Sequence, residues 1–375
     1  MSAPRNVLLV TYDCVRSDVA YRACLPGLRR LRESGVTFNR AISAAPLTPV
    51  SHATIFTGVQ PYRHGVRHML RERLAAGRLT LAQHLARAGF DTAAVVACAA
   101  LSRWYGLNRG FRLYDDAFGT QVRRATDVVK RGQRWLAGRP RDKRWLLFLH
   151  FFDAHRPYDP PGGVGDAANA YEAEIHYLDG QLDRLLDWLE GNGLLDETLV
   201  VVFADHGEDL DGLYPNDKGG VERGHPEEFG HGCLLYEQTQ HVPLVFAHPS
   251  LLVRSIDRLV GLVDIAPTVC ALLGVPRMPD VDGLDIVSEG AAQRVRRALY
   301  AETLYAAEAS GGAEVGRQAL WLDERYKIIR PWGDDTRAEV FDLVDDPCEL
   351  RPLRLAQLAP GLPSAWPNAG ERVRS

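Results

Sequence analysis

A carboxylate and an imidazole stand next to each other directly after a run of apolar, β-prone residues. The run is Val200 to Ala204, and Asp205, His206, Gly207 and Glu208 follow it. A run this short and apolar predicts a strand buried on both faces, and function in open α/β sheets gathers at the carboxyl ends of such strands. Oxygen and nitrogen donors of this mix suit Mg²⁺, Mn²⁺, Ca²⁺ or Zn²⁺. Asp205 and His206 therefore lie where a metal site would be built.

Polar groups follow two further apolar runs in the same way. Asn6 to Tyr12 predicts a first buried strand and ends in Asp13. Asp13 can serve as the N-cap of a following helix or add a carboxylate to the same edge of the sheet. Arg144 to Phe152 predicts another strand and is followed by Asp153 and His155. Carboxylates and imidazoles thus recur at predicted strand ends.

Thr48 offers a hydroxyl in a segment where hydroxyls recur at positions 48, 51, 54 and 57. Pro49 fits the first position of a helix, and Thr48 would then be the N-cap. The segment is either an ordinary well-capped helix, or it carries a nucleophile whose alkoxide is favoured by the helix N-terminus and a nearby cation. Thr48 alone leaves both interpretations open.

The elements that position these groups alternate along the chain. Amphipathic or apolar periodicity predicts helices over residues 26–35, 79–89, 126–136, 171–191 and 263–273, and strands over 91–97 and 242–246. From Ala298 the pattern changes to short strands with turns. We predict a main α/β catalytic domain over residues 1–297, a small α+β sub-domain over 298–359 and a tail over 360–375.

The composition limits the partners and the compartment. Of 375 residues, 46% are hydrophobic and 25% are charged, which is ordinary for a globular protein, and a net charge of −4 gives no reason to expect nucleic acid. The N-terminal apolar run, Val7 to Val10, is too short for a signal peptide or a membrane span, so we expect a cytoplasmic protein with no membrane partner. Six cysteines without a CxxC pair predict reduced core residues. The sequence leaves the oligomeric state open.

Taken together, three of these stretches resemble the sulfatase family within the alkaline-phosphatase superfamily. Asn6 to Asp18 resembles the opening of that family, Thr48 to Gly58 its nucleophile helix, and Asp205 to Glu208 its second metal motif. The resemblance implies an α/β fold in which a large, mostly parallel mixed sheet is flanked by helices, with a small C-terminal antiparallel sub-domain. It also implies a divalent cation and a covalent ester on the nucleophile.

The resemblance also implies roles for individual residues. Asp13, Asp205 and His206 match metal ligands, and Thr48 stands at the nucleophile position. His155 and His231 match positions that hold non-bridging oxygens of the substrate or protonate the leaving group. We predict that the substrate-binding side chains are those of His52, Asp153 and His225.

The sequence says less about how many cations bind than about which residues bind them. We expect one divalent ion, and a second ion held by Asp153, His155, His225 and His231 stays possible. Glu208 is expected to orient His206 without binding the cation, and His150 is expected to be a core histidine.

The chain departs from the family pattern at positions that carry charge or reactivity. Family members oxidise a cysteine or serine in a Cys/Ser-x-Pro-x-Arg signature to formylglycine, and Thr48 cannot yield that aldehyde because its β-carbon carries a methyl group. Cys24 only imitates the signature, since its arginine comes one place late. Cys14 replaces the second of two paired aspartates, and a lysine expected near Cys98 is absent. These changes predict a site that is less cationic and less tightly ligated.

Three hypotheses follow for the function. The first is a metal-dependent hydrolase or phosphotransferase that acts on phosphoric esters through a covalent Thr48 intermediate. The alternative is a sulfuric-ester hydrolase that uses unmodified Thr48, since sulfate monoesters carry less charge than phosphate dianions. A third is a catalytically inactive protein that keeps the fold and binds a partner. The first two predict a small-molecule phosphate or sulfate ester as the substrate.

Overall fold

The computed structural model describes residues 2–117, 122–163, 167–210, 212, 214, 217, 230–288, 298–312, 315–353 and 366. Apart from residue 366, the tail predicted over 360–375 lies outside these residues, and the predicted segment boundaries stay predictions. Among the helices of the described residues, none has the length and apolar character needed to cross a bilayer.

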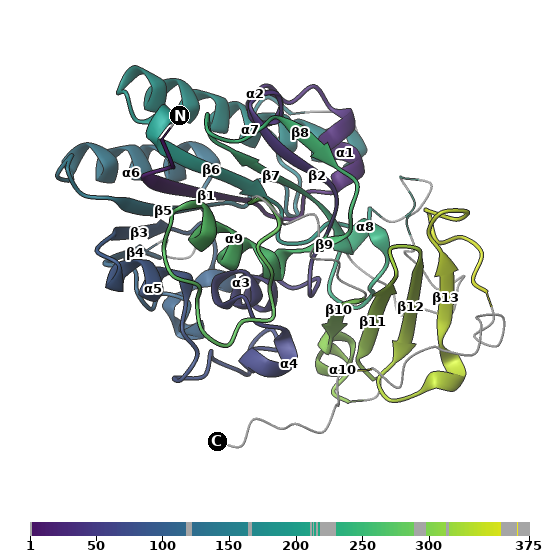
Figure 1. The fold of residues 1–375 in the computed structure, drawn as a ribbon. Coiled ribbons are helices and arrows are strands. Elements are labelled where there is room, and N and C mark those ends of the chain that lie inside the picture. Colours follow the sequence, from purple (N-terminus) through teal and green to yellow (C-terminus); the bar gives the residue numbers. More distant parts are fainter. Residues whose placement is uncertain are drawn as a thin grey trace.

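The main sheet is mixed and mostly parallel, as the sequence predicts. Its strands lie in the order β4-β3-β5-β1-β6-β7-β2-β8, and β9 pairs with β2 (Figure 1). From β4 to β6 all neighbours are parallel, whereas β7 runs antiparallel to both β6 and β2. The strands are β1 (Asn6–Tyr12), β2 (Gly35–Ile42), β3 (Asp91–Val95), β4 (Leu113–Asp115), β5 (Trp145–Phe151), β6 (Thr198–Phe203), β7 (His241–Ala247), β8 (Arg254–Ile256) and β9 (Val260–Gly261).

Helices cover both faces of this sheet, which explains why its central strands are buried throughout and mostly apolar. Every residue of β1, β5 and β6 is buried, as expected for parallel strands between two helical layers. One face carries α1 (Ser17–Arg22), α2 (Pro26–Glu33), α6 (Ala125–Gly138) and α7 (Ala167–Gly191); the other carries α3 (Thr48–Thr57), α4 (Pro61–His64), α5 (Leu81–Arg87) and α9 (Ile265–Leu272) (Figure 1).

A second, antiparallel sheet follows the main one, and this part of the predicted fold is also confirmed. Its order is β10-β11-β12-β13, and it lies beside the main sheet, next to α8 (Glu237–Gln240) (Figure 1). The Glu302 N–H donates to the carbonyl of Ala44 at 3.0 Å, which joins the two parts through their backbones. The elements are β10 (Ala298–Thr303), α10 (Tyr305–Ala309), β11 (Arg317–Leu322), β12 (Tyr326–Pro331) and β13 (Glu339–Asp342).

Candidate active site

The carboxyl ends of β1 and β6 bring two carboxylates to one level of the sheet. The two strands are parallel, with Thr11 opposite Phe203. Asp13 and Asp205 each come two residues beyond this pair, so both reach the same edge. On the other side of β1, Thr11 lies opposite His150 of β5. The register of three parallel strands therefore assembles the polar groups that the sequence separates.

Asp13 uses both of its oxygens within the site. Oδ2 accepts a hydrogen bond from His150 Nε2 at 2.9 Å, and Oδ1 accepts one from the Cys14 thiol at 2.9 Å. Burial works against ionisation here, but the hydrogen bond and charge of His150 hold the pKa of Asp13 well below its ordinary value. Cys14 itself adopts a left-handed backbone with φ of 62°, which non-glycine residues rarely do outside functional sites.

Helix α3 brings the Thr48 hydroxyl to these groups. All ten of its residues are buried, and Gly58 ends it in the left-handed conformation (φ 66°), where its N–H caps the Thr54 carbonyl. Thr48 is the first helical residue and Leu47 the N-cap, so the predicted start is one residue late. Thr48 Oγ1 lies 3.2 Å from His206 Nε2 and 3.4 Å from Asp13 Oδ2.

His206 presents a bare ring nitrogen to this centre. Its Nδ1 lies 3.0 Å from the Gly207 carbonyl, an acceptor only, so Nδ1 carries the proton and Nε2 keeps its lone pair. A side chain at Gly207 is excluded, because a Cβ there would lie 2.0 Å from the carbonyl oxygen of Gln238. The chain is thus held close to Gln238 at the point where the imidazole turns into the site.

Asp205 keeps one oxygen unpaired. Its Oδ1 accepts the backbone N–H of His206 at 3.0 Å, while its Oδ2 is buried without a hydrogen-bond partner. The nearest ring nitrogens, His206 Nε2 and His52 Nδ1, are 3.5 and 3.6 Å away. Burial, and next the charge of Asp13, raise the pKa of Asp205 well above its ordinary value.

These donors fit a divalent cation. Asp13 and Asp205 are both fully buried, and within the described chain their side chains contact only histidines, a thiol, a hydroxyl and a backbone amide. Two buried carboxylates whose described partners include no arginine or lysine have only histidines to balance their charge. The orphaned Asp205 oxygen, the bare His206 nitrogen and the Thr48 hydroxyl are the kinds of atom that bind Mg²⁺, Mn²⁺, Ca²⁺ or Zn²⁺.

His155 and His231 lie beside this centre. The rings of His206 and His231 are 4.3 Å apart between centroids, and those of His155 and His231 are 5.1 Å apart. His231 Nδ1 lies 3.0 Å from Glu208 Oε2, and His155 Nδ1 lies 2.6 Å from the carbonyl of Arg156. Both predicted histidines are thus close to Thr48 and the metal-ligand candidates, and both are partly exposed.

The three predicted substrate-binding residues are placed differently. His52 is fully buried, with its ring nitrogens at 2.8 Å from the Thr48 carbonyl and 3.1 Å from Thr11 Oγ1, so it holds α3 against β1. Asp153 accepts the Ala125 N–H at 2.9 Å and forms an ion pair with Arg124, which ties it to the start of α6. Neither geometry supports substrate binding. His225 lies outside the described residues.

Two residues play parts that differ from the sequence-based expectation. Glu208 contacts His231, not His206, because the chain after His206 carries it across the site. His150 is not a passive core histidine, since it donates to Asp13. It is the one polar side chain in β5, and a single polar residue inside an apolar buried strand was a usable signal. Arg16, buried and paired with Asp217 at 2.5 Å, donates to the Glu208 carbonyl.

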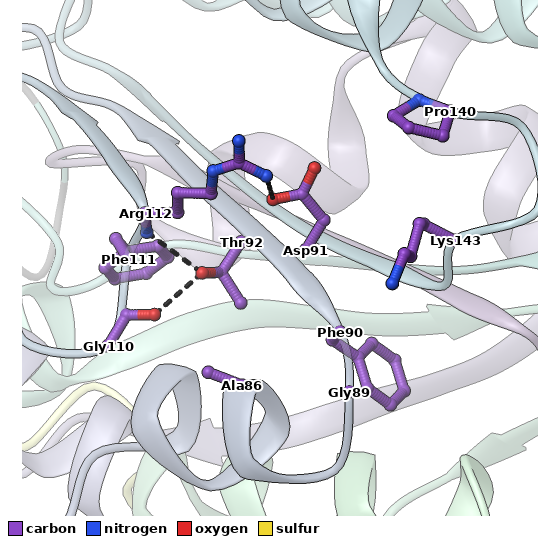
Figure 2. Close-up of a pocket in the computed structure, with 10 residues that line it drawn as sticks. All are labelled: Ala86, Gly89, Phe90, Asp91, Thr92, Gly110, Phe111, Arg112, Pro140 and Lys143. Atoms are coloured by element: carbon purple, nitrogen blue, oxygen red, sulfur yellow. Dashed lines mark hydrogen bonds and ion pairs between the residues drawn. The ribbon is translucent and has the colours of Figure 1, made fainter.

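A cavity of about 410 Å³ lies at the opposite, amino end of β3 and is unrelated to this centre. Figure 2 shows Thr92 bonded to the carbonyl of Gly110 and the N–H of Arg112, and Arg112 paired with Asp91 at 3.6 Å. None of the predicted site residues that the structure describes lines this cavity. An open cavity and the reactive groups thus occupy opposite edges of one sheet.

Comparison with known proteins agrees with this arrangement. Residues 5–275 match the family model described as Sulfatase, and residues 229–357 match that described as N-sulphoglucosamine sulphohydrolase, C-terminal. Arylsulfatase K of Xenopus laevis is 25% identical over 193 residues, which are 50% of this chain and 33% of that protein. The chain thus spans about a third of the length of that relative.

Solved structures share the fold at low identity. BT4656, solved in complex with its substrate D-glucosamine-2-N,6-O-disulfate, superimposes with a TM-score of 0.77 at 18% identity, covering 94% of this chain and 93% of that one. The phosphonate monoester hydrolase of Agrobacterium radiobacter gives a TM-score of 0.71 at 20% identity, covering 93% and 91%. These likenesses confirm the predicted alkaline-phosphatase-like architecture.

The comparisons overturn one prediction, that of action on phosphoric esters. Both family models and the curated relative carry names of sulfatases or sulphohydrolases, and the substrate of BT4656 is a sulfated sugar. Among the proteins named above, only the phosphonate monoester hydrolase is named for a phosphorus-containing substrate. Thr48 misled the prediction, because a hydroxyl nucleophile that cannot become formylglycine was taken to favour phosphoryl transfer.

Proposed function

Because the chain belongs to the sulfatase family, we propose that it hydrolyses sulfuric esters with unmodified Thr48 as its nucleophile. The observation that carries the proposal is the convergence of two polar atoms, Asp13 Oδ2 and His206 Nε2, on Thr48 Oγ1, with the orphaned Asp205 Oδ2 lying 3.5 Å from His206 Nε2. A threonine that served only to begin a helix would not need buried acceptors from two different strand ends.

The chain's own groups suit an attack by Thr48 on sulfur. Oγ1 bonds to the sulfur atom as the bond from sulfur to the leaving oxygen breaks, and the leaving oxygen keeps that electron pair. The hydroxyl proton has an acceptor in place, since Asp13 Oδ2 lies 3.4 Å from Oγ1. Water then attacks the sulfur of the sulfated threonine, which releases sulfate and restores the hydroxyl.

The proposal includes a divalent cation beside Thr48. Asp13, Asp205 and His206 would hold it, with the Thr48 hydroxyl as a further oxygen donor. When bound, such a cation lowers the pKa of the hydroxyl and neutralises negative charge on the sulfonyl oxygens. His150 keeps the Asp13 carboxylate oriented through its 2.9 Å hydrogen bond, as a second layer of residues does in other metal sites.

The proposed nucleophile is tested by three threonine variants. Purified protein is loaded with Mg²⁺, Mn²⁺, Ca²⁺ or Zn²⁺ and assayed on 4-nitrophenyl sulfate. Thr48→Ala should lower kcat by about 10³-fold or more, because the covalent route is lost. Thr48→Ser keeps a hydroxyl and should retain turnover. Thr57→Ala is the matched control, since Thr57 is buried in the same helix, where its hydroxyl donates to the Ala53 carbonyl and accepts the Val59 N–H.

Equal activity of Thr48→Ala and the wild type would show that Thr48 is not the nucleophile. Mass spectrometry of a quenched reaction should also find a sulfate group on the peptide that contains Thr48 and none on that peptide from Thr48→Ala. Absence of turnover from wild type carrying stoichiometric metal would instead favour a binding protein that has kept the fold.

A further inference from the structure

The cavity at the amino end of β3 is lined by apolar side chains and by a lysine. Its volume of about 410 Å³ lies within the range of small-molecule sites, about 300–1,000 Å³. Ala86, Phe90, Phe111 and Pro140 supply apolar surface, and Lys143 lines the cavity beside them. Figure 2 shows the Lys143 ammonium pointing in among these side chains. Within the described chain this exposed ammonium has no hydrogen bond or ion pair.

The carboxylate among the described lining residues, that of Asp91, is already paired. Its side chain is 9% exposed and lies 3.6 Å from Nη1 of Arg112, which also lines the cavity (Figure 2). Because Arg112 offsets the charge of Asp91, the ammonium of Lys143 gives the lining a net positive charge. The cavity therefore favours an anion over a cation.

Two guanidinium groups stand directly behind the lining residues. Arg139 Nη1 donates to the carbonyls of Pro140 and Lys143, at 2.9 Å each. Arg144 lies over the ring of Phe90, with its Cζ atom 4.2 Å from the ring centroid. Each group is thus separated from the cavity by one residue, and each adds positive potential to it.

These two arginines and Arg5 have no carboxylate partner among the described residues. Arg5 and Arg139 each keep a buried Nε without a hydrogen-bond partner, and Arg139 is only 9% exposed. Arg144 donates to the carbonyls of Arg5 and Leu273, at 3.0 and 2.9 Å. Burial lowers the pKa of both Arg139 and Arg144, and the charge of Arg5 acts on both in the same direction. Positive charge is therefore in excess at this edge of the sheet.

From these contacts we propose that the cavity binds a small aromatic acid, with its ring system against Phe90 and Phe111 and its anionic group on the Lys143 ammonium. One unpaired ammonium suits one negative charge, and an anion there also offsets the repulsion among the guanidinium groups behind the lining. The two phenylalanines favour an organic anion over an inorganic one, because an aromatic ligand buries apolar surface on them. The site lies at the opposite edge of the sheet from Thr48 and does not depend on the proposed sulfuric-ester hydrolysis.

Two naphthalene probes of the same shape test the charge of the ligand. Naphthalene-2-sulfonate is an anion, whereas naphthalene-2-sulfonamide is neutral, and calorimetric titration measures the affinity of each. The sulfonate should bind one-to-one and about tenfold more tightly than the sulfonamide, because only the sulfonate makes a charge-assisted hydrogen bond to the ammonium. Its affinity should fall as salt is added, since the charges are partly exposed and are screened. Equal affinities of the two probes would overturn the proposal.

Two further anions test the aromatic class. Naphthalene-2-carboxylate should also bind, because it carries the same charge and the same rings. Inorganic sulfate should bind about 100-fold more weakly than the sulfonate, because it leaves Phe90 and Phe111 uncovered. If the carboxylate does not bind, or if sulfate displaces the sulfonate at equal concentration, the proposed class of ligand is wrong.

Two variants test the cavity itself. Lys143→Met keeps the apolar stem, so it should weaken binding of the sulfonate about tenfold and leave that of the sulfonamide unchanged. Ala86→Trp should abolish binding of both probes by filling the cavity, and Ala86 is exposed on α5, so the larger side chain does not enter the core. Lys130→Met is the matched control, since Lys130 is exposed on α6 and does not line the cavity. Wild-type affinity in Lys143→Met and Ala86→Trp would overturn the site.

Amide NMR signals locate the bound probe. Naphthalene-2-sulfonate should shift the signals of residues 86–92, 110–112 and 140–143 and leave those of α3 in place. Shifts confined to α3 would place the probe beside Thr48 and overturn the proposal. No turnover enters these measurements, so a protein that binds the probe here but hydrolyses no aryl sulfate refutes the proposed function and supports this site.

Discussion

Two buried charge clusters in this molecule are balanced in opposite ways. The strand-end cluster contains Asp13 and Asp205, whose neighbours are histidines, a thiol and a hydroxyl. The junction cluster, between the two sheets, contains Glu237, Glu349 and Lys327; Glu349 and Lys327 are buried, and the Glu237 side chain is 14% exposed. Lys327 Nζ lies 3.0 Å from Glu237 and 2.7 Å from Glu349. One cluster thus contains a lysine, and the basic groups among the described contacts of the other are histidines.

In each cluster the pKa of one carboxyl is lowered and that of the other is raised: Asp13 and Glu237 are lowered, whereas burial raises the pKa of Asp205 and brings that of Glu349 to about 7. Burial opposes the charge of Glu237, yet Lys327 holds the pKa of that carboxyl below its ordinary value. Burial acts in the same direction on Asp205, but its next neighbour is the anion of Asp13, so the pKa of Asp205 rises. The clusters differ in the base that meets the carboxylates: the junction pair contacts a lysine, whereas the described bases near the strand-end pair are histidines, and Asp205 Oδ2 is left without a hydrogen bond. The contrast is the physical argument for a metal at the strand ends.

The largest change in the free energy of unfolding is expected when the lysine of the junction cluster is removed. Lys327→Met leaves Glu237 and Glu349 buried without their partner and should lower the free energy of unfolding by about 3–5 kcal/mol. Chemical denaturation measures the loss. The control is the triple variant with Glu237→Gln and Glu349→Gln added, which should recover most of it, because no buried charge is then left unpaired. If Lys327→Met lowers the free energy of unfolding by less than about 1 kcal/mol, water solvates the two carboxylates in place of the lysine.

A smaller change in the free energy of unfolding is expected when a divalent cation binds to the strand-end cluster. A divalent ion that binds only the folded chain at 100 times its Kd stabilises by about 2.7 kcal/mol. Thermal unfolding with and without chelator should show this shift in the wild type and in Glu349→Gln. Asp205→Asn should lose most of it, and calorimetric titration with Mn²⁺ or Zn²⁺ should show weaker binding. An equal shift in Asp205→Asn would place the ion elsewhere in the molecule.

The grouping of Asp13 and Asp205 could be predicted because it follows from local patterns. Short apolar runs gave the buried strands, parallel strands share a carboxyl edge, and Pro49 marked the start of the Thr48 helix within one residue. The place of Thr48 beside them, the mixed sheet and the antiparallel C-terminal sheet were predicted from the resemblance to the sulfatase family. These features depend on neighbours in sequence or on one strand pairing.

The side-chain partners could not be predicted, because they depend on how distant segments pack. Glu208 meets His231 across 23 residues of sequence, and no local pattern says which histidine it faces. Asp153 turns to the Ala125 N–H because α6 begins beside the end of β5. His52 is enclosed by the packing of α3 on β1. The ester class was also beyond the residues alone, since a threonine nucleophile is compatible with either acid.

The smallest change in the free energy of unfolding is expected from single amide substitutions. It should have opposite signs in the two clusters, so it tests the comparison most directly. In excess chelator, Asp205→Asn removes a buried carboxyl whose ionisation is opposed by burial and by Asp13, so it should raise the free energy of unfolding by about 1 kcal/mol. Glu237→Gln removes a partner of Lys327 and should lower it by about 1–3 kcal/mol. Both replace a buried carboxylate by an amide of the same shape, so differences in packing cancel. If Asp205→Asn destabilises the metal-free protein as Glu237→Gln does, Asp205 already has a partner in solution, and the strand-end cluster needs no cation.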